Sequence, residues 1–344
     1  MPEPILRVIQ WSVGNIGRQS LRGVIAHPRM ALVGIYVGSP DKAGRDAGDL
    51  CGLSDTGIIA TSAIDDILSL DADCVLYMRQ GCDYDEVCAL LASGKNVVTT
   101  RSEFHHPSTM DPAILAQIEA ACAAGGTSIY STGSSPGFVT EALVLPLLSL
   151  QRRLDCLTID EFADVSRRDS PAMIFDVMGF GAAPGPMDDA KLAHVRDSFL
   201  ASLNQVADAI GLPFDTTSVE GEVAVVTKDT PIAAGVLKAG TVAAQRITIN
   251  GLHDGKPVLR FRAHWYCATD LDRDWTLRET GWHVSVAGDT PMEVAITFPV
   301  AMEDYAAVMP GYTAHRAVNS VAAVCAAQPG IRTTIDLPQV VATF

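Results

Sequence analysis

The sequence predicts an α/β fold, in which a doubly wound parallel sheet is joined to a second α+β domain built on a mostly antiparallel sheet. Three observations support this prediction. Before about residue 130, short apolar runs alternate with helical patterns, which is typical of a parallel sheet wrapped by helices. The first apolar run ends in a glycine-containing turn. After Gly133 the pattern changes to long β-rich runs.

The first domain contains six expected strands, most of them continuous apolar runs suited to burial on both faces. They are Ile5–Trp11, Ala31–Val37, Gly57–Ala60, Cys74–Tyr77, Asn96–Thr99 and Thr127–Tyr130. The expected helices are Gly17–His27, Ala63–Ser69, Tyr84–Ser93 and Pro112–Ala124. Asp111 is a plausible N-cap of the last of these helices. Pro112 then stands at the first helical position, where its missing N–H costs nothing.

The second domain begins with an expected helix over Val139–Leu150 and a strand over Cys156–Ala163, followed by a long helix over Asp189–Ile210. The later strands are Glu220–Lys228, Gly240–Asn250, Val258–Tyr266, Trp282–Val286 and Met292–Phe298. A final amphipathic helix, Gly311–Ala327, is expected to pack on the first domain. The predicted divisions are therefore 1–138, 139–310 and 311–344.

Composition excludes several classes of protein. The chain has 344 residues, and 25 Lys and Arg against 40 Asp and Glu give a net charge of −15, which argues against a nucleic-acid partner. A hydrophobic content of 48% excludes intrinsic disorder. Apolar stretches such as Ala142–Leu150 fall far short of the roughly 18 residues of a membrane span, so no membrane association is expected.

The start of the chain and its cysteines indicate a reducing compartment. The first residues lack the basic region and apolar run of a signal peptide, so we expect a cytoplasmic location. The eight cysteines are scattered singly, without the paired spacing of a zinc site or a disulfide framework. We interpret them as reduced, structural thiols.

The glycine-containing turn has the position of a dinucleotide-binding loop in a Rossmann-type domain. The strand ends in Ser12, and Gly14, Asn15, Ile16 and Gly17 lead directly into a helix. Gly14 lets the backbone approach a pyrophosphate, Gly17 permits close packing, and the helix N-terminus supplies N–H groups. Ser12 replaces the first glycine of the usual pattern. The alternative is an ordinary tight turn between a strand and a helix.

Cofactor choice is decided near the end of the second strand, where NAD enzymes usually carry an acid. Tyr36–Gly38 stands there, followed by Ser39, Lys42 and Arg45, which could hold a 2′-phosphate. NADP(H) is therefore preferred. NAD(H) remains possible because Asp41 could turn toward a ribose, and the two cations could simply be solvated.

Further candidate residues follow the next strands, since ligands of such sheets bind beyond the carboxyl ends of strands. Met78, Thr100 and Arg101 are expected to contact the cofactor. Glu103 could accept a proton from an amine or stabilise an iminium. The alternative for Glu103 is a solvated loop carboxylate.

Other motifs give weaker signals. His105 and His106 are adjacent but lack a third ligand at helical spacing, so we predict no metal site. The turn Ser131–Phe138 is rich in glycine and serine, which favours a hinge between domains. The substrate-binding candidates, which could equally be core residues, are Phe138, Met173, Phe175 and His264.

Together these motifs resemble the family of 2,4-diaminopentanoate dehydrogenase and native amine dehydrogenases, relatives of dihydrodipicolinate reductase. The resemblance is carried by QWSVGNIG, IYVGSPDKAGRD, the post-strand Glu103, STGSSPGF and HRAVNSVAAVCAAQPGI. It implies that Glu103 is the catalytic carboxylate and that Asn319 lies near the nicotinamide. It also implies that the second domain supplies the substrate pocket and a homodimer interface. Dihydrodipicolinate reductase itself differs in its substrate motif, which this chain lacks.

The expected function is that of an NAD(P)H-dependent amine dehydrogenase. Such an enzyme converts a small ketone or aldehyde and ammonia to a primary amine, and its reverse reaction is oxidative deamination. Two alternatives remain open at this point. The chain could reduce an imine or a carbonyl compound without ammonia, or it could bind the dinucleotide as a sensor without turnover.

Overall fold

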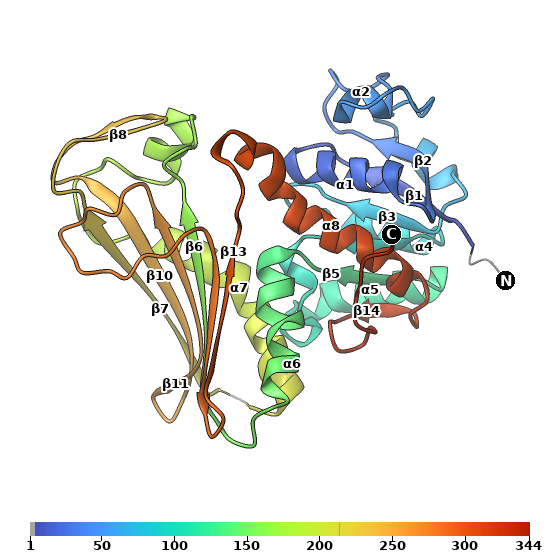
Figure 1. Cartoon of the computed structure of the whole chain (residues 1–344). Coiled ribbons are helices and arrows are strands. Elements are labelled where there is room, and N and C mark those ends of the chain that lie inside the picture. Colours follow the sequence, from blue (N-terminus) through green and yellow to red (C-terminus); the bar gives the residue numbers. More distant parts are fainter. Residues whose placement is uncertain (1–3, 213) are drawn as a thin grey trace. The chain divides into compact units, whose positions relative to one another are not determined.

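The computed structural model describes residues 4–212 and 214–344 (Figure 1). The chain divides into two compact units. The first unit comprises residues 1–142 and 304–344, and the second comprises residues 143–303. The chain therefore leaves the first unit after Ala142 and returns to it at Asp304.

The first unit is built on a parallel sheet with the strand order β14-β5-β4-β3-β1-β2. Its strands are β1 (Leu6–Trp11), β2 (Met30–Tyr36), β3 (Cys74–Tyr77), β4 (Asn96–Thr99), β5 (Ser128–Ser131) and β14 (Gly330–Arg332). The chain adds β2 on one side of β1 and then continues with β3 on the other side. This reversal confirms the predicted doubly wound sheet and is the point where such folds bind ligands.

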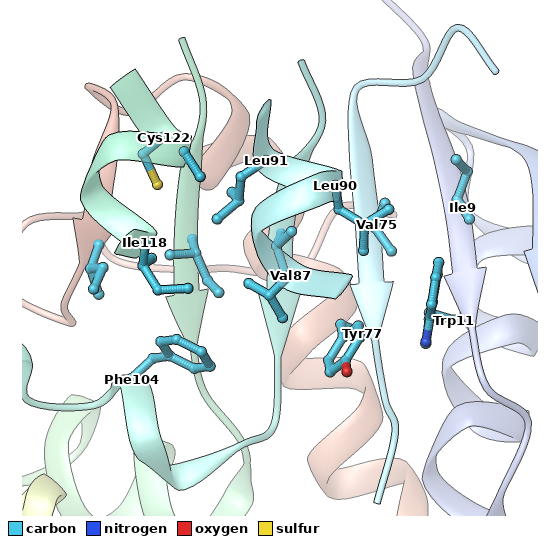
Figure 2. Close-up of a cluster of buried hydrophobic side chains, with 14 of the residues drawn as sticks. Ile9, Trp11, Val75, Tyr77, Val87, Leu90, Leu91, Phe104, Ile118 and Cys122 are labelled. Atoms are coloured by element: carbon cyan, nitrogen blue, oxygen red, sulfur yellow. The ribbon is translucent and has the colours of Figure 1, made fainter. Parts of the chain in front are cut away.

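Helices cover both faces of this sheet because its strands are apolar on both faces. They are α1 (Asn15–Ala26), α2 (Ala47–Cys51), α3 (Ile64–Ser69), α4 (Tyr84–Ala92), α5 (Pro112–Gly125) and α8 (Tyr305–Cys325). Figure 2 shows one face, where Trp11 and Tyr77 lie in a cluster with Leu90 and Ile118 from α4 and α5. On the opposite face, Val8 belongs to a cluster that includes residues of α1 and α8.

The helix ends follow the local chemistry. Asp111 accepts hydrogen bonds from the N–H groups of Ala113 and Ile114 at 2.8 and 3.2 Å, which confirms the predicted cap of α5. At the other end of α5, Gly126 adopts a φ of 66°, a left-handed conformation that favours glycine. The cap and the terminating glycine thus set the limits of the helix that covers β4 and β5.

The prediction of a strand at 57–60 in the first unit was wrong, and strand β14 was not predicted. Segment 57–60 makes only isolated bridges, because its hydrogen bonds go largely to the loop that precedes α2: Ala60 N–H bonds Arg45 O at 2.9 Å and Ala47 N–H bonds Ile58 O at 2.9 Å. The sixth strand is instead β14 near the C-terminus, which pairs with β5. The expected C-terminal helix also begins earlier, at Tyr305.

The second unit contains a mixed, mostly antiparallel sheet, as predicted, and its strand order is β13-β12-β6-β11-β10-β7. Its strands are β6 (Leu154–Asp164), β7 (Thr216–Val225), β10 (Val242–His253), β11 (Lys256–Tyr266), β12 (Gly281–Gly288) and β13 (Met292–Thr297). Only the pair β6 and β11 is parallel among these described strands. Helix α7 (Asp189–Ile210) packs on one face, where Phe199 stacks on Phe261 with ring centroids 3.9 Å apart.

Two features of the chain after residue 133 differ from expectation. The helix expected over 139–150 is divided into a helical segment, Ser134–Ala142, with a kink at its start, and the short helix α6 (Val144–Leu148). A small hairpin of β8 (Thr230–Ile232) and β9 (Gly235–Leu237) was not expected. Within residues 4–212 and 214–344, no helix is long and apolar enough to cross a membrane.

Candidate functional site

A cavity of about 890 Å³ lies in the first unit, beyond the carboxyl ends of β1, β2, β3 and β4. It is therefore located where the strand order reverses. Most of the residues predicted to bind the cofactor line it: Ser12, Gly14, Asn15, Ile16, Gly17, Ser39, Lys42, Met78, Thr100 and Arg101. Arg45 and Asn319 are not among the lining residues. Sequence and structure thus point to the same location, and the cofactor-binding roles remain predictions.

The glycine-containing turn is shaped by Ser12, which adopts a φ of 71°. This left-handed conformation is the one that the replaced glycine would favour. A Cβ atom on Gly17 would lie 2.2 Å from the Ser12 carbonyl oxygen, so only glycine fits at position 17. A Cβ atom on Gly14, in contrast, would meet no atom of the described chain within 4 Å. The turn is therefore tight on its inner side and open at Gly14.

A buried side chain that the sequence reasoning missed holds this turn. The Gln10 amide donates a hydrogen bond to the Ser12 carbonyl at 2.9 Å, and its oxygen accepts one from the Ser20 hydroxyl at 2.7 Å. Gln10 lies on β1 and Ser20 on α1, and both are fully buried. The sequence did contain a signal for this role, since Gln10 is a polar residue in the buried part of strand β1.

The N-terminus of α1 fits an anionic group. Gly14 is its N-cap residue, no side chain caps the helix, and its first turn contains no acid. The N–H groups of the first turn and the positive end of the helix dipole therefore remain available to a phosphate. On these grounds, the cavity suits the pyrophosphate of a dinucleotide.

The loop after β2 presents Ser39 and Lys42 to the cavity. Lys42 Nζ also donates a hydrogen bond to the Val13 carbonyl at 3.0 Å, which ties this loop to the glycine-containing turn. The Ser39 hydroxyl donates to Asp41, and this hydrogen bond holds the pKa of Asp41 below its ordinary value. Arg45 points elsewhere, because its Nε lies 2.8 Å from the Asp49 carboxylate.

Glu103 lies in a 3-10 helix, Ser102–Phe104, directly after the loop that follows β4. It does not line the cavity, but its Oε1 accepts a hydrogen bond at 2.9 Å from the guanidinium of Arg101, which does. The Arg101 backbone is fixed as well, because its N–H bonds Thr99 Oγ1 at 3.2 Å and its carbonyl accepts from the Ser131 hydroxyl. Glu103 is therefore a held carboxylate and not a free loop charge.

Several buried polar atoms near this pair have no hydrogen-bond partner within the described part of the chain. They include Oε2 of Glu103, Nε of Arg101, and the hydroxyls of Thr132 and Ser135. These residues follow the carboxyl ends of β4 and β5. Buried polar groups are normally paired, so this concentration indicates a place where a polar ligand completes the hydrogen bonding.

The two adjacent histidines both have polar partners. His105 Nδ1 lies 2.6 Å from Glu141 Oε1, and His106 Nδ1 lies 3.3 Å from the Thr109 hydroxyl. Over the ranges 4–212 and 214–344, no group of three or more potential ligands is arranged to hold a metal ion. Glu141 is a second residue that the sequence reasoning missed.

The predicted substrate-binding residues are divided between the two units. Phe138 belongs to the first unit, where the Arg316 guanidinium lies 5.9 Å from the centre of its ring. In the second unit Met173 is 41% exposed, whereas the Phe175 ring packs against Gly181 and Gly235. Their roles in substrate binding remain predictions.

His264, also in the second unit, belongs to a buried ionic cluster. Its Nε2 lies 2.9 Å from Asp160 Oδ1, and its ring stacks on Phe162 with centroids 4.5 Å apart. Arg262 donates to both oxygens of Asp160, at 2.5 and 2.8 Å. The His264 imidazole is thus already oriented by a carboxylate.

Known proteins resemble this chain over most of its length. Residues 138–344, more than half of the chain, match the family model of the 2,4-diaminopentanoate dehydrogenase C-terminal domain. An amine dehydrogenase of Streptomyces virginiae is 28% identical, and the match covers 97% of this chain and 96% of that protein. A 2,4-diaminopentanoate dehydrogenase of Acetoanaerobium sticklandii is 24% identical over 74% of this chain and 70% of the relative.

A solved structure has the same fold. The amine dehydrogenase from Mycobacterium smegmatis superposes with a TM-score of 0.75 at 18% identity, covering 98% of this chain and 97% of that one. At this level of identity the match shows a shared architecture. The fold assigned from the strand order and the fold of this relative therefore agree.

Proposed function

Because the chain belongs to the 2,4-diaminopentanoate dehydrogenase family, we propose that it is an NAD(P)-dependent amine dehydrogenase that uses ammonia. In the proposed reaction, a small ketone or aldehyde and ammonia give a primary amine, and the reverse reaction is an oxidative deamination. The bound nicotinamide supplies the hydride that reduces the carbon–nitrogen double bond.

The observation that carries this proposal is the arrangement of Glu103. One carboxylate oxygen is held by Arg101 at 2.9 Å, and the other is buried without a hydrogen-bond partner among residues 4–212 and 214–344. A carboxylate held in this way keeps one oxygen available for a cationic nitrogen. An ammonium or iminium group supplies both the charge and the N–H donors that this oxygen can accept.

Glu103 has a proton-transfer role in this scheme. Glu103 takes a proton from ammonium, and the ammonia so formed attacks the carbonyl carbon. After a proton has passed from nitrogen to oxygen within the adduct, Glu103 donates its own proton to the hydroxyl, which leaves as water and yields the iminium. The carboxylate is thereby regenerated beside the iminium cation, and its negative charge stabilises that cation until hydride arrives.

NADP(H) preference is part of the same proposal. Lys42 and Ser39 line the cavity at the end of β2, where they supply a cation and a hydroxyl for a 2′-phosphate. Arg45 could join them only by leaving Asp49. Assembly as a homodimer is also proposed, and its support is the family resemblance.

The experiment is a steady-state assay of NADPH and NADH consumption with a panel of small ketones and aldehydes, with and without excess ammonium at alkaline pH. The proposal predicts turnover only when ammonium is present, with the higher kcat/KM for NADPH. Turnover that does not depend on ammonium would contradict the proposal and identify a carbonyl or imine reductase. Tight dinucleotide binding without turnover would instead favour a sensor.

A further inference from the structure

A buried network lies directly beside the segment that carries Glu103. The side chains of His105 and Glu141 are each 1% exposed, and His105 Nδ1 lies 2.6 Å from Glu141 Oε1. The second oxygen of Glu141 accepts a hydrogen bond from the Thr334 hydroxyl, which lies 3.1 Å from the Tyr130 hydroxyl. All four residues belong to the first unit.

The network joins parts of the chain that are far apart in sequence. His105 follows the 3-10 helix after β4, and Tyr130 lies on β5. Glu141 lies near the end of the helical segment after β5, and Thr334 follows β14. Burying a carboxylate such as that of Glu141 is costly unless a positive or hydrogen-bonding partner accompanies it, so a buried carboxylate held by several partners suggests a specific role. The proton-transfer scheme for Glu103 uses none of these four side chains.

The position of His105 next to Glu103 suggests that the network helps to fix the turn that contains Glu103. Its backbone N–H bonds the Ser102 carbonyl at 3.3 Å, which closes the helical turn that contains Glu103. The intervening Phe104 is fully buried and packs edge-on against Tyr84. On the other side of Glu103, Arg101 is fixed through its carbonyl and its N–H. Glu103 is therefore anchored from both directions along the chain.

We propose that His105 is a positioning residue, whose buried contact with Glu141 fixes the turn that presents the Glu103 carboxylate. This inference rests on the proposed function of Glu103. When His105 loses the contact with Glu141, the turn rotates or loosens, and Glu103 no longer meets the reacting nitrogen correctly. Thr334 acts one step further away, because it orients the Glu141 carboxylate from its other oxygen.

The test compares His105→Ala with His105→Asn, in which an amide nitrogen replaces Nδ1 and can still bond Glu141. His105→Ala is expected to lower kcat about 10–100-fold, since small misplacements of a reacting group have effects of this size. His105→Asn is expected to restore most of this loss. The Kd for NADPH, measured by fluorescence titration, should change less than about twofold in both variants, because neither His105 nor Glu141 lines the cavity.

His253→Ala is the matched control. This histidine also contacts a carboxylate, that of Asp215 at 3.2 Å, but the pair is exposed and lies in the second unit, so the kcat of the variant should match that of the wild type. If His105→Ala does not fold, Thr334→Val serves instead. It removes the hydroxyl that bonds Glu141 and is expected to lower kcat about threefold, with an unchanged Kd for NADPH.

A double variant separates positioning from general damage. In a Glu103→Gln background there is no carboxylate left to position, so adding His105→Ala should lower the residual kcat little further. The proposal is overturned if His105→Ala lowers kcat by the same factor in both backgrounds. It is also overturned if His105→Asn restores nothing, or if His105→Ala leaves kcat unchanged. If Glu103→Gln alone leaves turnover intact, the proposed function fails, and that result is distinct from all of these.

Discussion

The Arg101 guanidinium lines the cavity beyond the parallel sheet and donates a hydrogen bond to Glu103 Oε1 at 2.9 Å. This contact connects the predicted cofactor site to the predicted catalytic carboxylate through one side chain. Glu103, which does not line the cavity, is thereby joined to a residue that does. The predicted catalytic carboxylate and the predicted cofactor site are therefore linked within the first unit.

Gly17→Ala should destabilise the protein and weaken dinucleotide binding. The added Cβ would lie 2.2 Å from the Ser12 carbonyl oxygen, so the turn has to shift. We expect a loss of about 1–3 kcal/mol in the free energy of unfolding, as for other overpacked positions. Chemical denaturation and fluorescence titration with NADPH measure the two effects.

Gly14→Ala is the matched variant, because its added Cβ would meet nothing within 4 Å in the described chain. The free energy of unfolding should stay at the wild-type value. Binding of NADPH should nevertheless weaken, since the dinucleotide backbone approaches the chain at this glycine. Wild-type affinity in Gly14→Ala would place the pyrophosphate elsewhere.

Lys42→Ala should lower the affinity for NADPH more than the affinity for NADH. A hydrogen bond to a charged group contributes about 1.5–3 kcal/mol, so we expect the ratio of the two Kd values to change at least about 10-fold. The ratio is the useful quantity, because Lys42 also bonds the Val13 carbonyl and its loss affects both cofactors.

Arg45→Ala completes this test. Since Arg45 is paired with Asp49, the same ratio should change less than in Lys42→Ala. An equal or larger change would mean that Arg45 leaves Asp49 and binds the 2′-phosphate. An unchanged ratio in both variants would contradict the proposed NADP(H) preference at this loop.

Asp160→Ala should destabilise the second unit strongly. The carboxylate is buried and bonded by Arg262 and His264, and removing one partner of a buried ion pair costs about 3–5 kcal/mol. Asp155→Ala is the control, because its pair with Arg153 is exposed on both sides and should contribute little. Denaturant titrations of the two variants give the comparison.

The effect of Asp160 should depend on pH in a defined direction. Burial raises the pKa of Asp160, but the hydrogen bonds from His264 and Arg262 outweigh it and hold the pKa below its ordinary value of 3.8. The stabilisation by the carboxylate is therefore complete above that pH and is lost as the pH falls through the lower, folded-state pKa. The stability difference between wild type and Asp160→Ala should shrink only under strongly acidic conditions. A difference that shrinks already near neutral pH would contradict this.

Long apolar elements could be predicted from sequence because their periodicity extends over many residues. The long helix of the second unit has the predicted bounds, Asp189–Ile210, and α5 begins at the predicted Pro112. Short segments depend on their neighbours in space. Segment 57–60 is β-rich but bonds a loop, whereas Gly330–Arg332 has little β character and becomes a strand because β5 lies beside it.

The candidate site shows the same distinction. The turn at Ser12 was predictable because the strand, turn and helix follow one another in the sequence, even though serine replaces the first glycine and adopts its conformation. The contacts of Gln10, His105 and Glu141 were not, since each buried polar side chain finds its partner only in the folded chain. Glu141 and Thr334, for example, are separated by 193 positions.

The most direct test of the account is turnover by Glu103→Gln. This variant keeps the size of the side chain and an oxygen that can accept from Arg101, so the Kd for NADPH should be unchanged. The ammonium-dependent kcat should fall about 10²–10⁴-fold, the usual contribution of a general acid–base group. A Glu103→Gln variant with wild-type kcat in the same assay would contradict the assignment of Glu103 as the proton-transferring carboxylate.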